Sequence, residues 1–190
     1  MQNEKINIGI AIIGRISSGK STFAKELSNH YNITIASFGS YLRYYCECNG
    51  FKTDRETLQN IGEDFIRNDP KILLNNVITF SRQKTNDYIF EGVRHFVIFE
   101  ELKNISRKYF TVFIDADQNT RFYRYLERNK DSDINKTLEQ FTASDNHPVE
   151  LEIESLKHDC CLIVDSTKYR LIDFKPVFDK LLVDNNYYAL

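Results

Sequence analysis

The chain has 190 residues, which fits one domain with at most one or two small insertions. Hydrophobic residues make up 42% and charged residues 27%, and the formal net charge is −2, so the chain can build a core but lacks the basic excess typical of nucleic-acid-binding proteins. No apolar run is long enough to cross a bilayer, the polar start does not resemble a signal peptide, and the four cysteines lack zinc-site spacing. We therefore expect a cytoplasmic protein with no nucleic-acid or membrane partner.

The first half of the chain alternates strand patterns with helix patterns. Ile6–Ile13 is an apolar run, as in a strand buried on both faces of a parallel sheet. From Gly19 to Tyr31, apolar residues recur every four positions, which predicts a helix. Four further elements are then expected: a strand over Ile33–Phe38, a helix over Tyr41–Cys48, a helix begun by a capping box of Thr53 and Glu56, and a helix from Asp69 and Pro70 to about Arg82.

The second half continues the alternation. Its expected strands are Tyr88–Val93, Tyr109–Asp115 and Cys160–Asp165. Its expected helices are one from Asp117 to Arg128, one begun by Thr137 and Gln140, one opened by Pro148, and a last one carrying Phe174, Phe178 and Leu181. This order predicts a three-layer α/β fold around a five-stranded parallel sheet. The helical stretch between the second and third strands is long for one crossover, so we expect residues 39–86 to form an insertion.

One motif has a definite chemical meaning. The segment Gly14-Arg15-Ile16-Ser17-Ser18-Gly19-Lys20-Ser21 matches the P-loop pattern G-x-x-x-x-G-K-[ST], with a strand pattern before it and a helix pattern after it. Such a loop directs backbone N–H groups at phosphates, while its lysine contacts the β- and γ-phosphates and its serine binds Mg²⁺. We therefore expect ATP and Mg²⁺ as cofactors, with nucleotide contacts from Gly14, Ser17, Ser18, Gly19, Lys20, Ser21 and Thr22. The GTPase patterns D-x-x-G and N-K-x-D are missing at the required places.

Two further segments indicate a phosphate acceptor. The segment from Ser37 to Arg43, SFGSYLR, resembles the S-T-G-D-x-L-R segment of adenylate-kinase-like enzymes, and Glu91 to Arg94, EGVR, resembles their D-G-x-x-R. The resemblance is to the group of nucleoside-monophosphate kinases, deoxynucleoside-monophosphate kinases and dephospho-CoA kinases. It implies that Ser37, Gly39, Arg43 and Arg94 bind the acceptor and that Glu91 lies near the metal with Ser21. Ser17, Ser40 and Glu91 depart from that group, which has glycine, aspartate and aspartate at these positions.

A third segment carries Arg121, Arg124 and Arg128 on one face of the expected helix. This face is either a solvated basic surface or, as the resemblance implies, a set of arginines that reach the triphosphate beside a mobile lid. We select Arg121 and Arg128 as catalytic candidates and residues 129–147 as the lid. The core then comprises residues 1–38, 87–128 and 148–190.

The resemblance implies an ATP-dependent phosphotransferase in which Lys20, Glu91, Arg121 and Arg128 act in catalysis. A nucleoside or deoxynucleoside monophosphate is the expected acceptor. Two alternatives stay open: transfer to a hydroxyl, as in dephospho-CoA kinases, where Glu91 could act as a base, and a non-catalytic ATP-binding regulatory or assembly protein. The oligomeric state is also left open.

Overall fold

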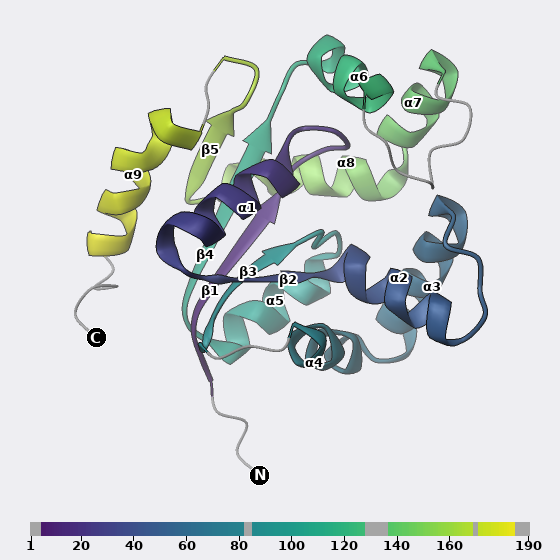
Figure 1. Cartoon of the computed structure of the whole chain (residues 1–190), viewed down its shortest axis with the longest axis horizontal. Helices are drawn as coiled ribbons and strands as arrows, with labels where there is room; N and C mark the ends of the chain where they lie inside the picture. Colours follow the sequence, from purple (N-terminus) through teal and green to yellow (C-terminus); the bar gives the residue numbers. More distant parts are fainter. Residues whose placement is uncertain (1–4, 82–84, 128–136, 169–170, 185–190) are drawn as a thin grey trace.

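A computed structural model describes residues 5–81, 85–127, 137–168 and 171–184 (Figure 1). At its centre lies a five-stranded sheet in the order β2-β3-β1-β4-β5. All four strand pairs are parallel. The strands are β1 (Ile6–Ile13), β2 (Thr34–Ser37), β3 (Asp87–Glu91), β4 (Ser106–Asp115) and β5 (Leu162–Asp165). The predicted fold class, an α/β fold with a five-stranded parallel sheet, is confirmed.

Helices cover both faces of this sheet, which makes three layers (Figure 1). One face of β1 carries Ile8, Ile10 and Ile12, which pack in one core cluster with residues of α1 (Lys20–Tyr31) and α9 (Leu171–Asp184). The opposite face packs against α4 (Pro70–Phe80), α5 (Phe96–Ile105) and α8 (Pro148–Ser155). Because both faces are covered, β1 is apolar along nearly its whole length, as its sequence predicted.

Three helices lie between β2 and β3, where we expect the insertion: α2 (Phe38–Cys48), α3 (Arg55–Asn68) and α4. Side chains at their N-termini fix where all three begin, and Ser37 caps α2 by accepting a hydrogen bond from the Ser40 amide. Asp54, and not the predicted Thr53, caps α3 by accepting a hydrogen bond from the Thr57 amide, and Asp69 caps α4 as predicted. Asp54 rather than Thr53 is the cap because the Asp54 carboxylate, three residues before Thr57, reaches the Thr57 amide. The division of the chain into core, insertion and lid stays a prediction.

The remaining elements differ from the sequence-based expectation in their limits. β3 ends at Glu91 rather than Val93, because Gly92 turns the chain with a φ of 85°. β4 begins at Ser106 rather than Tyr109, because Ser106 pairs with Ile6 of β1. The helix α5 was not predicted. The other helices are α6 (Gln118–Glu127), α7 (Leu138–Asp145) and a short 3₁₀ turn, Leu156–Asp159. Within the described residues, no helix combines the length and apolar character that crossing a bilayer requires.

Candidate functional site

The P-loop faces a cleft of about 1200 Å³ at the carboxyl-terminal edge of the sheet. In open α/β sheets, ligands bind at this edge. The cleft is bordered by the P-loop, the start of α1, residues of α2 and α3, the loop after β3 and one turn of α6. Its volume exceeds that of a pocket for one small ligand, which is about 300–1000 Å³. The cleft is therefore larger than one small ligand requires.

The backbone of the P-loop needs its glycines. Gly14 and Gly19 have φ values of 139° and 99°, in the region that side chains disfavour. Ser17, where related loops carry glycine, also has a positive φ, 59°. A Cβ atom added to Gly14 would lie 2.2 Å from the carbonyl oxygen of Ile114, at the end of β4. The loop thus fits closely against the sheet, and its shape depends on Gly14 having no side chain.

Replacing Gly14 with alanine is expected to displace the loop and weaken nucleotide binding at least tenfold, because the Ile114 carbonyl belongs to the core sheet and cannot move away. Gly39→Ala serves as the comparison for thermal stability alone, because a Cβ atom there meets nothing within 4 Å but Gly39 borders the cleft. Titration with a fluorescent ATP analogue and thermal unfolding of both variants measure the effect. Unchanged affinity in Gly14→Ala would show that the close approach does not shape the loop.

The start of α1 offers backbone N–H groups to an anion. Gly19 is its N-cap residue, no side chain of the described residues caps it, and its first turn has no acidic residue. Backbone N–H groups at a helix N-terminus and the helix dipole both favour a phosphate there. Lys20 Nζ donates to the carbonyl oxygens of Gly14 (2.6 Å) and Arg15 (2.7 Å), which holds the ammonium group over the loop. These residues fit the phosphates of a nucleoside triphosphate.

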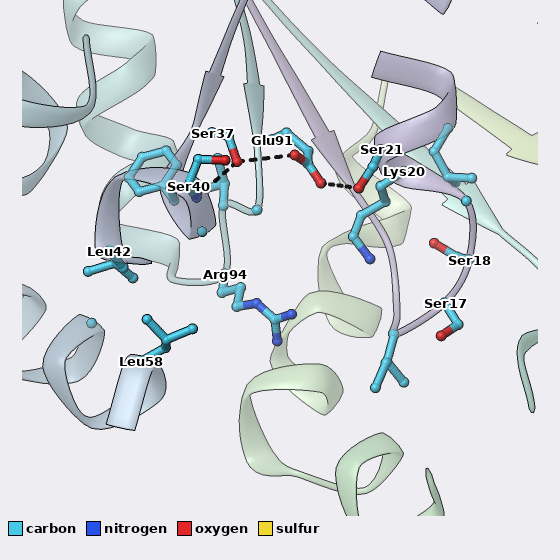
Figure 2. A pocket seen from close by; sticks show the side chains of 18 of the residues that line it. Ser17, Ser18, Lys20, Ser21, Ser37, Ser40, Leu42, Leu58, Glu91 and Arg94 are labelled. Carbon is cyan, nitrogen blue, oxygen red and sulfur yellow. Dashed lines mark hydrogen bonds between the residues drawn. The ribbon is translucent and has the colours of Figure 1, made fainter. Parts of the chain in front are cut away.

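Glu91, the last residue of β3, links the first turn of α1 to the end of β2. Its carboxylate accepts hydrogen bonds from Ser21 Oγ at 2.5 Å and from Ser37 Oγ at 3.2 Å (Figure 2). Mg²⁺ in kinase sites takes one or two oxygens from the protein and the rest from water and phosphate. The described residues contain no cluster of three or more acidic, histidine or cysteine ligands, and such a magnesium site needs none. The pair predicted as metal ligands, Ser21 and Glu91, therefore lies together and has the oxygen donors that Mg²⁺ requires.

Three arginines border the other side of the cleft: Arg43 on α2, Arg55 at the start of α3 and Arg94 after β3. Arg43 and Arg94 were predicted, and Arg55 was not. Arg94 points into the same open space as Lys20, which enters from the P-loop side (Figure 2). Ser37 and Gly39, also predicted, border this space as well. The sequence-based acceptor residues and the P-loop thus share one cleft.

The two described arginines of α6, Arg121 and Arg124, lie in different surroundings. Arg121 is 4% exposed, and both of its terminal nitrogens donate to the carboxylate of Asp145. It is not among the residues that border the cleft, whereas Arg124 is. Arg124 donates to the carbonyl oxygen of Ser18 in the P-loop (3.2 Å) and to Ser166 after β5 (2.7 and 2.9 Å). Arg128 lies outside the described residues. Arg124 therefore borders the cleft, whereas Arg121 donates to the Ile16 carbonyl oxygen of the P-loop (3.5 Å) without bordering the cleft, and the catalytic role expected for Arg121 stays a prediction.

The described part of the expected lid is joined to the P-loop. In α7, Phe141 is fully buried and packs with Ile16 and Tyr125. Asp145 at the end of α7 also lies 3.1 Å from Arg15 Nε. These contacts were missed because the segment looks polar in sequence. Its role as a lid stays a prediction.

Solved structures of other proteins share the fold of this chain. The structure of TT1252 from Thermus thermophilus is similar with a TM-score of 0.60 and 18% identity, covering 95% of this chain and 98% of that one. Shikimate kinase from Aquifex aeolicus gives 0.53 and 20%, covering 96% and 98%, and shikimate kinase from Bacteroides thetaiotaomicron gives 0.53 and 14%, covering 92% and 98%. At these identities, the likeness shows a shared P-loop kinase fold.

No curated protein matches the chain in sequence. The family model AAA_18, described as an AAA domain, matches residues 10–147, which include the P-loop, the three helices after β2 and the arginine helix α6. Because this match spans more than half of the sequence, the chain belongs to the AAA domain family AAA_18.

Proposed function

We propose that this protein is an ATP- and Mg²⁺-dependent phosphotransferase that acts on a small phosphorylated acceptor, most simply a nucleoside or deoxynucleoside monophosphate. One observation supports this proposal above the others. The P-loop and the Ser21–Glu91 pair border one side of the cleft. Arg43 and Arg94 border the opposite side of the same cleft. A protein that only binds ATP has no need for a second cationic group facing the first across a cavity.

Each side of the cleft has its own task in this proposal. Bound ATP–Mg²⁺ would supply the phosphoryl group. Lys20 and the N–H groups at the start of α1 would stabilise negative charge on the phosphates, and Ser21 and Glu91 would hold the metal. Arg43 and Arg94 would grip the acceptor phosphate, because a guanidinium group can donate two parallel hydrogen bonds to phosphate oxygens. Phosphoryl transfer needs mostly positioning and charge stabilisation, which these residues provide.

Arg124 extends the nucleotide side of this proposal. It lies between the P-loop and the loop after β5, close to Gly19. From there, its guanidinium group would lie near the nucleotide and replace Arg121 as the α6 arginine that contacts it. The role expected for Arg128 stays a prediction.

A panel of acceptors tests the proposal. ADP release from ATP is measured with each common nucleoside and deoxynucleoside monophosphate, and with dephospho-CoA and shikimate as hydroxyl acceptors. Stimulation by at least one monophosphate supports the proposal. Stimulation only by dephospho-CoA or shikimate would move the reaction to a hydroxyl acceptor, and ATP binding without stimulation by any compound would support the regulatory alternative.

Arg43→Ala is expected to raise the KM for the acceptor roughly tenfold to a hundredfold, because the acceptor loses one charge-assisted hydrogen-bonding group. The affinity for ATP is expected to stay within about twofold. Arg67→Ala is the matched control, since Arg67 lies on α3 with its side chain 75% exposed. Steady-state kinetics with the best acceptor and calorimetry with an ATP analogue separate the two effects. An equal loss of ATP affinity would place Arg43 at the donor side.

A further inference from the structure

A buried carboxylate lies outside the cleft, between the P-loop and two of the acceptor-side arginines. Glu150, in the first turn of α8, has a side chain only 1% exposed. Burying a charged group is unfavourable unless the group is paired and hydrogen-bonded. The proposed reaction gives this carboxylate no direct task, because it does not border the cleft. Its burial beside a phosphate-binding loop therefore needs another explanation.

The two oxygens of Glu150 face two different parts of the site. Oε2 accepts a hydrogen bond from the backbone N–H of Ile16 in the P-loop at 2.8 Å. Oε1 accepts one from Arg94 Nη1 at 2.5 Å and lies 3.8 Å from Arg55 Nη2. One carboxylate thus connects the donor loop to two of the three arginines on the acceptor side.

The surroundings keep this group charged. Burial raises the pKa of Glu150, but the positive charges of Arg94, Lys20 and Arg55 and the hydrogen bond from Arg94 outweigh it, so the pKa lies below its ordinary value. An ionised carboxylate forms shorter and stronger hydrogen bonds to a guanidinium group than a neutral one.

The contact with Glu150 holds the guanidinium group of Arg94 in place. Its side chain remains 34% exposed and borders the cleft, so the guanidinium group is held at one nitrogen and still faces the space for the acceptor. A free arginine side chain samples many rotamers, and ordering it on binding costs conformational entropy. A fixed partner removes much of that cost before the acceptor arrives.

We propose that Glu150 is a positioning residue that aims Arg94 into the acceptor site and fixes it relative to the P-loop through Ile16. The proposal deepens the proposed function and rests on it for the identity of the ligand. The opposite possibility is that Glu150 competes with the acceptor phosphate for Arg94. The two possibilities predict opposite changes in acceptor affinity when the charge of Glu150 is removed. The acceptor binds more weakly if Glu150 positions Arg94, and more tightly if Glu150 competes with it.

Glu150→Gln separates them. Glutamine has nearly the same shape, but it offers one acceptor oxygen instead of two and carries no charge, so Arg94 and the Ile16 amide cannot both keep their present bond. Glu152→Gln is the matched control on the same helix, because Glu152 is exposed and lies outside the cleft. Thermal unfolding verifies that both variants fold.

The first measurement needs no turnover. The Nε–H group of Arg94 is followed by ¹⁵N relaxation in ligand-free protein and assigned with Arg94→Lys. We expect an ordered group in the wild type and in Glu152→Gln, and a mobile one in Glu150→Gln. Equal order in all three proteins would overturn the proposal. Because no substrate is involved, loss of order in Glu150→Gln supports the positioning role even if no acceptor in the panel is phosphorylated.

The second measurement uses inorganic phosphate as the probe of the acceptor site, titrated in the presence of saturating Mg²⁺ and adenylyl imidodiphosphate. We expect its affinity to fall roughly tenfold in Glu150→Gln, as for a lost charge-assisted contact, when the nucleotide is kept saturating for each variant. Tighter phosphate binding would overturn the proposal in favour of competition. If Glu150→Gln does not fold, Glu150→Asp takes its place: it keeps the charge one methylene further from Arg94, so partial loss of order and affinity is expected, and full order of Arg94 would overturn the proposal.

Discussion

Lys20→Ala is expected to lower kcat/KM for phosphoryl transfer roughly a thousandfold, the upper range for removing one preorganised charge-stabilising group from an active site. The ammonium group of Lys20 lies over the P-loop, held by two carbonyl oxygens of the loop, at the end of the cleft where the β- and γ-phosphates would lie. Its charge would favour the transition state more than the bound substrate, because negative charge shifts between phosphate oxygens during transfer. Steady-state assays with the best acceptor measure the loss.

Lys180→Ala is the control for this experiment. Lys180 is an exposed residue of α9 that does not border the cleft, so its removal should leave kcat/KM within about twofold. Circular dichroism establishes that both proteins fold. Near-normal transfer by Lys20→Ala would show that the P-loop does not bind the donor.

Asp145→Ala is expected to lower the free energy of unfolding by roughly 3–5 kcal/mol, the usual effect of breaking a buried ion pair from one side. Arg121 would keep its charge at 4% exposure and lose the partner of both terminal nitrogens. Arg15 would lose a partner as well. Urea denaturation measures the change. Glu139→Ala, which changes an exposed residue of the same helix, should alter the free energy of unfolding by no more than about 0.5 kcal/mol. An equally small effect of Asp145→Ala would mean that the Arg121–Asp145 pair does not hold α7 in place.

The same region tests the catalytic role that the sequence pattern suggests for Arg121. If Arg121 only stabilises α7 against α6, variants that remain folded at low temperature keep their kcat per folded molecule. If it reaches the triphosphate, kcat per folded molecule falls even where the protein is stable. Activity measured beside the folded fraction distinguishes the two.

The fold could be predicted from the sequence where one element has one dominant pattern. β1 is apolar because it lies between β3 and β4 and under helices on both faces, and such a run has few alternatives. The N-cap of α3 was predicted one residue too early, since Thr53 and Asp54 are both good N-cap residues and only the local geometry selects Asp54. The helix α5 was missed because Phe96–Ile105 continues directly into β4 with no glycine or proline between them.

In the candidate site, too, residues within one contiguous motif could be predicted, whereas residues joined only by the fold could not. The P-loop and the two acceptor segments are contiguous motifs, so their residues could be named in advance. Arg55 and Glu150 join the site only through contacts between residues far apart in the chain, and their local sequence shows only a charged first helical turn. Arg121 and Arg124 are both on the arginine helix, and which of them is buried depends on Asp145, whose position the spacing on α6 does not reveal.

The central position of β1 has a consequence for the order in which the protein can form. β1 begins at the sixth residue, but its two neighbours, β3 and β4, span residues 87–91 and 106–115. During synthesis from the N-terminus, the P-loop therefore leaves the ribosome long before the Ile114 carbonyl against which Gly14 packs. Pairing between such distant segments forms slowly. A nascent chain should therefore bind ATP only after β4 has emerged, and chains truncated before that point would carry the complete motif without a nucleotide site.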